Sequence, residues 1–141
     1  MELLDIYAYK GRNIHSHKPV IKAVVDLGNL YDTPTTQIDG FNKMLLQILP
    51  GLKKHYCSLG YEGGFLERLN EGTYLAHVTE HMVLELQNMV GSEVNYGKSR
   101  VTEKPSVYTL VFEYKNEKLA TECLLEAIEI VNMLTEGILP E

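Results

Sequence analysis

Residues 73–89 read TYLAHVTEHMVLELQNM, and the apolar positions of this segment recur with the period of an α-helix. Thr73 is a suitable N-cap residue, and Gly91 is a suitable terminator. One face of the predicted helix carries a stripe of apolar side chains, namely Leu75, Val78, Met82, Leu86 and Met89. We expect this stripe to be buried, so the segment predicts the central helix of the fold.

The segments on either side of this helix predict the strands of a sheet and the other helices that pack on it. β-Branched and aromatic residues, or alternating apolar positions, predict strands at residues 3–9, 20–27, 94–101 and 107–114. Helical spacing of apolar residues predicts further helices at residues 39–49 and 117–135. The order of these elements predicts one α+β domain over residues 1–141. Its sheet is expected to be roughly four-stranded and mostly antiparallel or mixed, packed with three or so helices.

Composition narrows the class of protein. The 141 residues are 45% hydrophobic and 23% charged, with a net charge of −6, which is typical of a globular domain without affinity for nucleic acid. No apolar run reaches the roughly 18 residues that cross a bilayer, and acids near Met1 argue against a signal peptide, so we expect no membrane contact and a cytoplasmic location. The phosphate-binding glycine motifs are absent, so no nucleotide site is expected in this chain.

The predicted central helix also carries His77, Glu80 and His81 in an H-x-x-E-H pattern. Two histidines one turn apart lie on the same side of a helix, which suits two imidazoles that share one zinc ion. A neighbouring carboxylate is then placed to act as a general base in hydrolysis. This is the inverted arrangement of the zinc hydrolase motif H-E-x-x-H. The pattern therefore predicts a zinc site with Glu80 as the catalytic residue.

A catalytic zinc ion normally needs a third protein ligand. Cys57 is the first choice, because it lies in the glycine-rich segment 53–64, which predicts an ordered loop. Glu85 and Glu113 stay open as alternatives. A plainer interpretation also stays open: the two histidines and Glu80 form a solvated polar face, and Cys57 is a small buried side chain.

The sequence also supports a resemblance to a known family. The run HYCSLGYEGGFLERLNEGTYLAHVTEHMVLELQNMVG at residues 55–91, followed by YGKSR at 96–100 and VYTLVFEY at 107–114, resembles the N-terminal domain of cyanophycin synthetase. The resemblance implies a bacterial, ATP-dependent peptide ligase that builds cyanophycin, a poly-aspartate chain bearing arginine. It also implies ATP-grasp and Mur-ligase-like domains, which this chain lacks, and a homo-oligomer formed through the parent enzyme.

The resemblance assigns roles to individual residues. On that basis His77, His81 and Cys57 hold zinc, and Glu80 is the general base of a hydrolase that cuts cyanophycin into primers. Carboxylates suit the guanidinium groups of the polymer. The expected substrate-binding residues are Glu67, Arg68, Glu71 and Glu85. Two alternatives are a non-catalytic module that tethers the polymer and a packing domain that supports the ligase.

Overall fold

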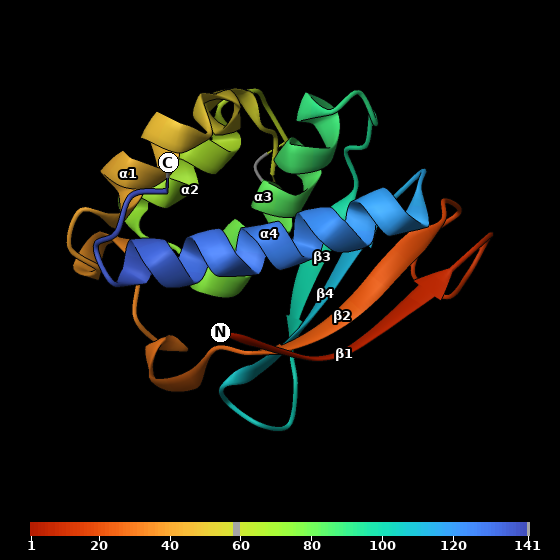
Figure 1. The fold of residues 1–141 in the computed structure, drawn as a ribbon, viewed down its shortest axis with the longest axis horizontal. Coiled ribbons are helices and arrows are strands. Elements are labelled where there is room, and N and C mark those ends of the chain that lie inside the picture. The colour runs from red at the N-terminus through yellow and green to blue at the C-terminus, as the bar shows by residue number, and fades with distance from the viewer. Residues whose placement is uncertain (58–59, 141) are drawn as a thin grey trace.

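The computed structural model describes residues 1–57 and 60–140, and its sheet has four antiparallel strands in the order β1-β2-β4-β3 (Figure 1). The strands are β1 (Glu2–Tyr9), β2 (Val20–Asp26), β3 (Gly97–Val101) and β4 (Val107–Glu113). The expected α+β class and the antiparallel sheet are confirmed. The third strand begins at Gly97 and not at residue 94, because the amides of Asn95 and Tyr96 donate to the Glu113 carboxylate instead of joining the ladder in full.

The helices lie together on one side of the sheet (Figure 1). They are α1 (Phe41–Ile48), α2 (Gly64–Glu71), α3 (Leu75–Met89) and α4 (Glu117–Thr135), joined by the short 3₁₀ helices η1 (Gly28–Leu30), η2 (Thr35–Gln37) and η3 (Pro50–Lys54). Helices α1, α3 and α4 confirm the three predicted helices to within two residues at each end. Within the described residues, no helix combines the length and apolar character that crossing a bilayer requires.

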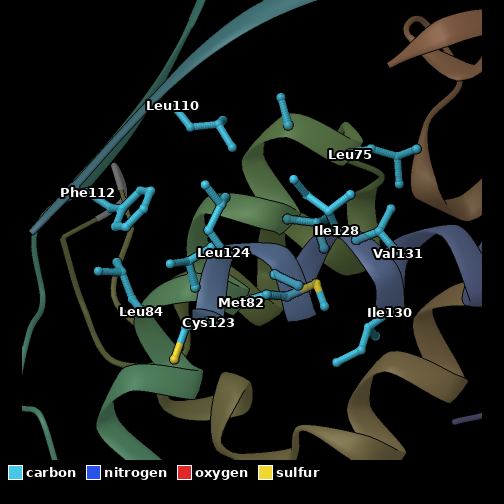
Figure 2. Close-up of a cluster of buried hydrophobic side chains, with 14 of the residues drawn as sticks. Leu75, Met82, Leu84, Leu110, Phe112, Cys123, Leu124, Ile128, Ile130 and Val131 are labelled. Atoms are coloured by element: carbon cyan, nitrogen blue, oxygen red, sulfur yellow. The ribbon is translucent and has the colours of Figure 1, made fainter. Parts of the chain in front are cut away.

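The core lies between the sheet and helices α3 and α4 (Figure 2). Side chains of paired strand residues share a face, so β2 and β4 together present an apolar surface to the helices. Its fully buried members are Ile21, Ala23, Val25, Leu110 and Phe112. From the helices, Met82, Leu124 and Val131 fill the space opposite this surface. The buried thiol of Cys123 lies in the same cluster.

The central helix α3 is buried around most of its circumference, and this changes the predicted stripe. Leu75, Val78 and Met82 are buried as expected. Leu86 is only half-buried, and Met89 is 60% exposed, so the predicted stripe is wrong at its C-terminal end. Residues 88–90, at the end of α3, are all exposed, whereas Gln87 beside them is fully buried. Helix α3 as a whole contacts η3, β3, β4 and α4.

Candidate functional site

The H-x-x-E-H residues form a compact cluster in the interior. The ligand atoms offered by His77, Glu80 and His81 all lie within 4.8 Å of one another. Glu80 and His81 are 5% and 4% exposed, and His77 is half-buried. All three line a cavity of about 1090 Å³ bounded by α2, α3, β3 and the segment after η3. These residues therefore face a cavity, and the interpretation as a solvated polar face is wrong.

Phe65 of α2 fixes the planes of the imidazole rings. Its side chain is fully buried and stacks on His81, with ring centroids 4.2 Å apart and an angle of 25° between the planes. The same ring meets His77 edge-on at 5.4 Å. Sequence reasoning missed this residue, because an aromatic side chain in a short helix gives no signal of which rings it will contact.

Each histidine of the cluster has its Nδ1 atom engaged by a residue outside the cluster. Thr73 Oγ1 lies 2.9 Å from His77 Nδ1, and His55 Nδ1 lies 3.1 Å from His81 Nδ1. Nε2 of His81 faces the cluster, 3.6 Å from Glu80 Oε2. Thr73 therefore orients His77 from one turn upstream, and the N-cap position that the sequence assigned to Thr73 belongs to Tyr74.

Burial sets the protonation state of the cluster. It lowers the pKa of His77 to about 4, aided by the charge of Arg68, and lowers the pKa of His81 to about 2, aided by His77 and His55. Burial also raises the pKa of Glu80 to about 8, against a smaller opposite effect of Arg100. Near neutral pH, the protein alone therefore holds two neutral imidazoles and a protonated carboxyl group.

This donor set fits a zinc ion. Neutral imidazole is the form that binds metal, and two histidines are a usual part of a zinc site that a third protein ligand completes. Partners on Nδ1 orient metal-binding histidines in the same way in known sites. The position of Glu80 is further restricted by Gly97 of β3, where a Cβ atom would lie 2.9 Å from Glu80 Oε2 and 3.0 Å from Cγ. Because Gly97 has no side chain, the backbone of β3 approaches the Glu80 carboxylate more closely than a residue with a Cβ atom at position 97 would allow.

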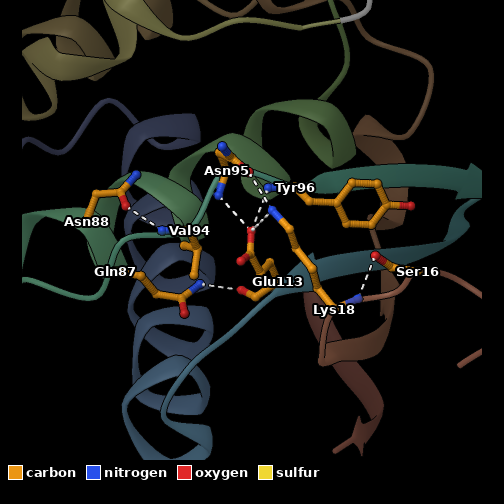
Figure 3. A network of polar contacts seen from close by, with 8 residues as sticks. All are labelled: Ser16, Lys18, Gln87, Asn88, Val94, Asn95, Tyr96 and Glu113. Carbon is orange, nitrogen blue, oxygen red and sulfur yellow. Dashed lines mark hydrogen bonds and ion pairs between the residues drawn. The ribbon is translucent and has the colours of Figure 1, made fainter. Parts of the chain in front are cut away.

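The three residues considered for a third ligand lie in different places. Cys57 lines the same cavity as the cluster. Glu85 Oε1 lies 2.8 Å from Nε2 of His55. Glu113 Oε1 accepts hydrogen bonds from the amides of Asn95 and Tyr96 and lies 3.5 Å from Lys18 Nζ (Figure 3). Of the three residues, Cys57 therefore lines the cavity, whereas Glu85 contacts His55 and Glu113 contacts Asn95, Tyr96 and Lys18. A role of Cys57 as a ligand stays a prediction.

The residues expected to bind substrate are also dispersed. Arg68 lines the cavity, whereas the Glu67 carboxylate accepts a hydrogen bond from the Tyr61 hydroxyl and Glu71 is exposed at the end of α2. Three further cationic residues line the cavity, namely Lys54, Lys98 and Arg100. Sequence reasoning assigned no role to them, although Lys98 and Arg100 belong to the YGKSR segment that carries part of the family resemblance.

Comparison with known proteins identifies the family. The model of the cyanophycin synthase-like N-terminal domain matches residues 22–136. Cyanophycin synthetase of Crocosphaera subtropica is 43% identical over 120 residues, which are 84% of this chain and 14% of that protein. Those of Synechocystis sp. and Geminocystis herdmanii are 37% and 38% identical over 96% and 97% of this chain, and the match covers 16% of each. The chain thus spans about one sixth or less of the length of these curated relatives, and it belongs to the cyanophycin synthase-like N-terminal domain family.

Proposed function

We propose that this domain is a zinc-dependent hydrolase that cuts cyanophycin internally and so supplies primers to a parent cyanophycin synthetase, an ATP-dependent ligase. The observation that carries the proposal is the buried cluster of His77, Glu80 and His81, which opens onto a large cavity. The relatives named above are cyanophycin synthetases, which supports cyanophycin as the polymer.

In this proposal His77 and His81 hold the zinc ion, and Cys57 completes the ligand set from across the cavity. Zinc, when bound, supplies a Lewis acid that polarises an amide carbonyl and makes water acidic near neutral pH. Glu80 takes the proton of the attacking water on its carboxylate and returns it to the leaving amine. Glu80 must be ionised for this role, and its pKa falls from about 8 when a cation lies beside it.

The charges around the cavity support a substrate that carries both signs. An arginine attached to aspartate through its α-amino group keeps a free carboxylate, which suits the cationic lining of Lys54, Arg68, Lys98 and Arg100. The guanidinium group suits the carboxylates of Glu67 and Glu71 on the exposed side of α2. Weak contacts of this kind along a repetitive chain would also hold the polymer near the other domains of the parent enzyme.

The cationic lining of the cavity favours a second candidate function, because binding of the polymer by these side chains does not depend on zinc. In that case the domain binds cyanophycin without cutting it and only tethers the polymer. Removal of zinc separates the two functions, since tethering would survive the removal and hydrolysis would not.

The test combines metal content with fragment release. The purified chain is expected to contain about one zinc ion and to release shorter polymer from cyanophycin without ATP. Glu80→Gln should keep zinc and lose about 10²-fold or more of the hydrolysis rate, because the amide cannot accept the proton. His81→Ala should lose zinc and hydrolysis together, and His17→Ala, at an exposed position, is the matched control.

Three results would contradict the proposal. Wild-type protein that releases no fragments with zinc supplied would leave tethering as the function. Cleavage by Glu80→Gln at the wild-type rate would remove Glu80 from the reaction. Loss of zinc from Glu80→Gln would instead identify Glu80 as a ligand and not as the base.

A further inference from the structure

One edge of the sheet borders the cavity. Strand β3 lies last in the order β1-β2-β4-β3, and no strand in the described part of the chain pairs with its other side (Figure 1). Gly97 and Ser99 of this strand line the same cavity as Glu80. We infer that the free edge of β3, formed by the backbone groups of Gly97 and Ser99, binds the backbone of an extended polymer as an additional strand. The identity of that polymer as cyanophycin rests on the proposed function, whereas the edge site does not.

The register of the ladder between β3 and β4 determines which backbone groups of β3 point outward. In an antiparallel ladder, residue pairs that exchange hydrogen bonds alternate with pairs that do not. The Glu113 amide donates to the carbonyl of Tyr96 at 2.8 Å, so Tyr96 and every second residue after it direct their backbone groups at β4. The N–H and C=O groups of Gly97 and Ser99 therefore point away from β4, toward the free edge.

The carbonyl of Ser99 shows that this edge is accessible to a hydrogen-bond donor. It accepts a hydrogen bond from Nη1 of Arg100 at 3.1 Å, and Arg100 is an exposed residue. A backbone N–H of a ligand can therefore replace the guanidinium group at this carbonyl, which leaves the guanidinium group for a carboxylate of the same ligand. Outward-pointing backbone groups of this kind are the usual template on which an extended chain adds a strand.

The free edge of β3 also lies next to the cluster. A Cβ atom at Gly97 would lie 2.9 Å from Oε2 of Glu80, so the strand backbone and this carboxylate are neighbours. Gly97 and Ser99 pair with Phe112 and Leu110, which are buried in the core, so these four residues share the face of the sheet that carries the helices. An added strand lies about 4.8 Å from its neighbour, and every second side chain of that strand faces the same way. Alternate side chains of the bound polymer would therefore face α3 and the cluster.

The charges on β3 favour an anionic polymer over a second copy of this chain. Lys98 and Arg100 are two positions apart, so both project from the same face of the strand, about 6.6–6.8 Å apart along it, and both reach the lining of the cavity. Residues opposite them in an added strand share that face, where carboxylates at every second position would meet both cations. A second copy that paired through the same edge would instead bring like charges together.

The experiment measures amide hydrogen exchange by NMR in the metal-free chain, with and without soluble cyanophycin fragments. At a fragment concentration ten times the Kd, exchange of the Gly97 and Ser99 amides should slow by about 10-fold. The amides of Lys98 and Arg100, which already face β4, and those of the opposite edge strand β1 should stay unchanged. A polymer that contacts only the side chains of the cavity would produce no such alternation.

A substitution at Ser99 provides the second arm. Ser99→Pro removes an N–H that points to the free edge and removes no donor from the ladder with β4. Affinity for the fragments, measured by calorimetry, should fall by about 2–10-fold or more. Ser99→Ala keeps the N–H and is the matched control, and denaturant unfolding checks that both variants are folded. The exchange measurement on the wild type decides the question if Ser99→Pro does not fold.

Poly-aspartate, which has the same backbone without arginine, separates the edge site from the proposed function. Protection of Gly97 and Ser99 by poly-aspartate alone would support the edge site and contradict cyanophycin as the polymer. Protection by cyanophycin in a chain that never cuts it would support the edge site while the proposed hydrolase fails. Unchanged exchange of both amides with either polymer would overturn the inference. Protection that grows with protein concentration without polymer would also overturn it, because it would assign the edge to a second copy.

Discussion

Replacement of Gly97 by alanine tests the position of Glu80 without touching its chemistry. The added Cβ would lie 2.9 Å from Oε2 and 3.0 Å from Cγ of Glu80, whereas ordinary contacts begin at 3.4 Å. The carboxylate must therefore move by about 0.5 Å or more, since it is the free end of a side chain and Gly97 belongs to a strand. A misplacement of about 1 Å in a catalytic group costs up to about 10²-fold in rate.

The effect of Gly97→Ala on stability should be limited. Gly97 has no positive φ, so alanine adopts its backbone conformation and gains about 0.4–1 kcal/mol through the unfolded chain. Overpacking costs about 1–3 kcal/mol, which leaves a net loss between about 0 and 2.6 kcal/mol.

The assay for Gly97→Ala compares fragment release from cyanophycin, with zinc supplied and ATP absent, with the unfolding free energy in denaturant. We expect hydrolysis to fall by about 10-fold to 10²-fold while the chain stays folded. Gly11→Ala is the control, because a Cβ there would meet nothing within 4 Å. In Glu80→Gln the second substitution should add little, since both act on one group. Hydrolysis by Gly97→Ala at the rate of Gly11→Ala would refute the argument that the strand positions Glu80.

Three further predictions concern pH, packing and salt. Burial raises the pKa of Glu80 from 4.5 to about 8, so the folded, metal-free chain keeps a proton that the unfolded chain loses, and the unfolding free energy should fall by about 1.4 kcal/mol per pH unit from about pH 6.5 to 8. Below pH 6.5 the lowered pKa values of His77 and His81 outweigh this effect, so the unfolding free energy should rise with pH up to about pH 6.5. Glu80→Gln should abolish only the decrease in unfolding free energy above pH 6.5. A decrease that persists in denaturant titrations of Glu80→Gln would contradict the assignment to Glu80. Met82→Ala should cost about 2–5 kcal/mol in thermal or denaturant unfolding, and half-buried Leu86→Ala clearly less, with equal losses contradicting the burial pattern. Binding of soluble cyanophycin fragments, measured by calorimetry, should weaken as salt rises and should survive zinc removal, whereas salt-insensitive binding would contradict charge pairing.

The sequence predicts best what is decided within one element. The helix at residues 117–135 was predicted at both ends, because Asn116 Oδ1 accepts from the Leu119 amide as an N-cap and the apolar period persists to Leu134. Likewise, the spacing of His77 and His81 along one helix was sufficient to predict that their side chains meet.

What the sequence could not predict depends on contacts between elements. The exposure of Met89 depends on which elements cover α3, and no periodicity within α3 encodes that cover. Two partners of His81, Phe65 and His55, come from α2 and from the residue that follows η3, and they reach the ring only through tertiary packing. Only His55 had a local signal, because it lies two residues before Cys57 in the loop predicted to line a site.

The single ring of Phe65 has a thermodynamic consequence for three histidines. It lies 4.2, 5.4 and 6.3 Å from the rings of His81, His77 and His55, so one apolar side chain limits the rotation of all three imidazoles. Immobilising a side chain on binding costs about 0.5–1.5 kcal/mol. Because packing against Phe65 orders these rings during folding, an ion or substrate that arrives later does not have to order them. For three rings that difference corresponds to roughly ten- to a thousand-fold in affinity, contributed by a residue that donates no ligand atom.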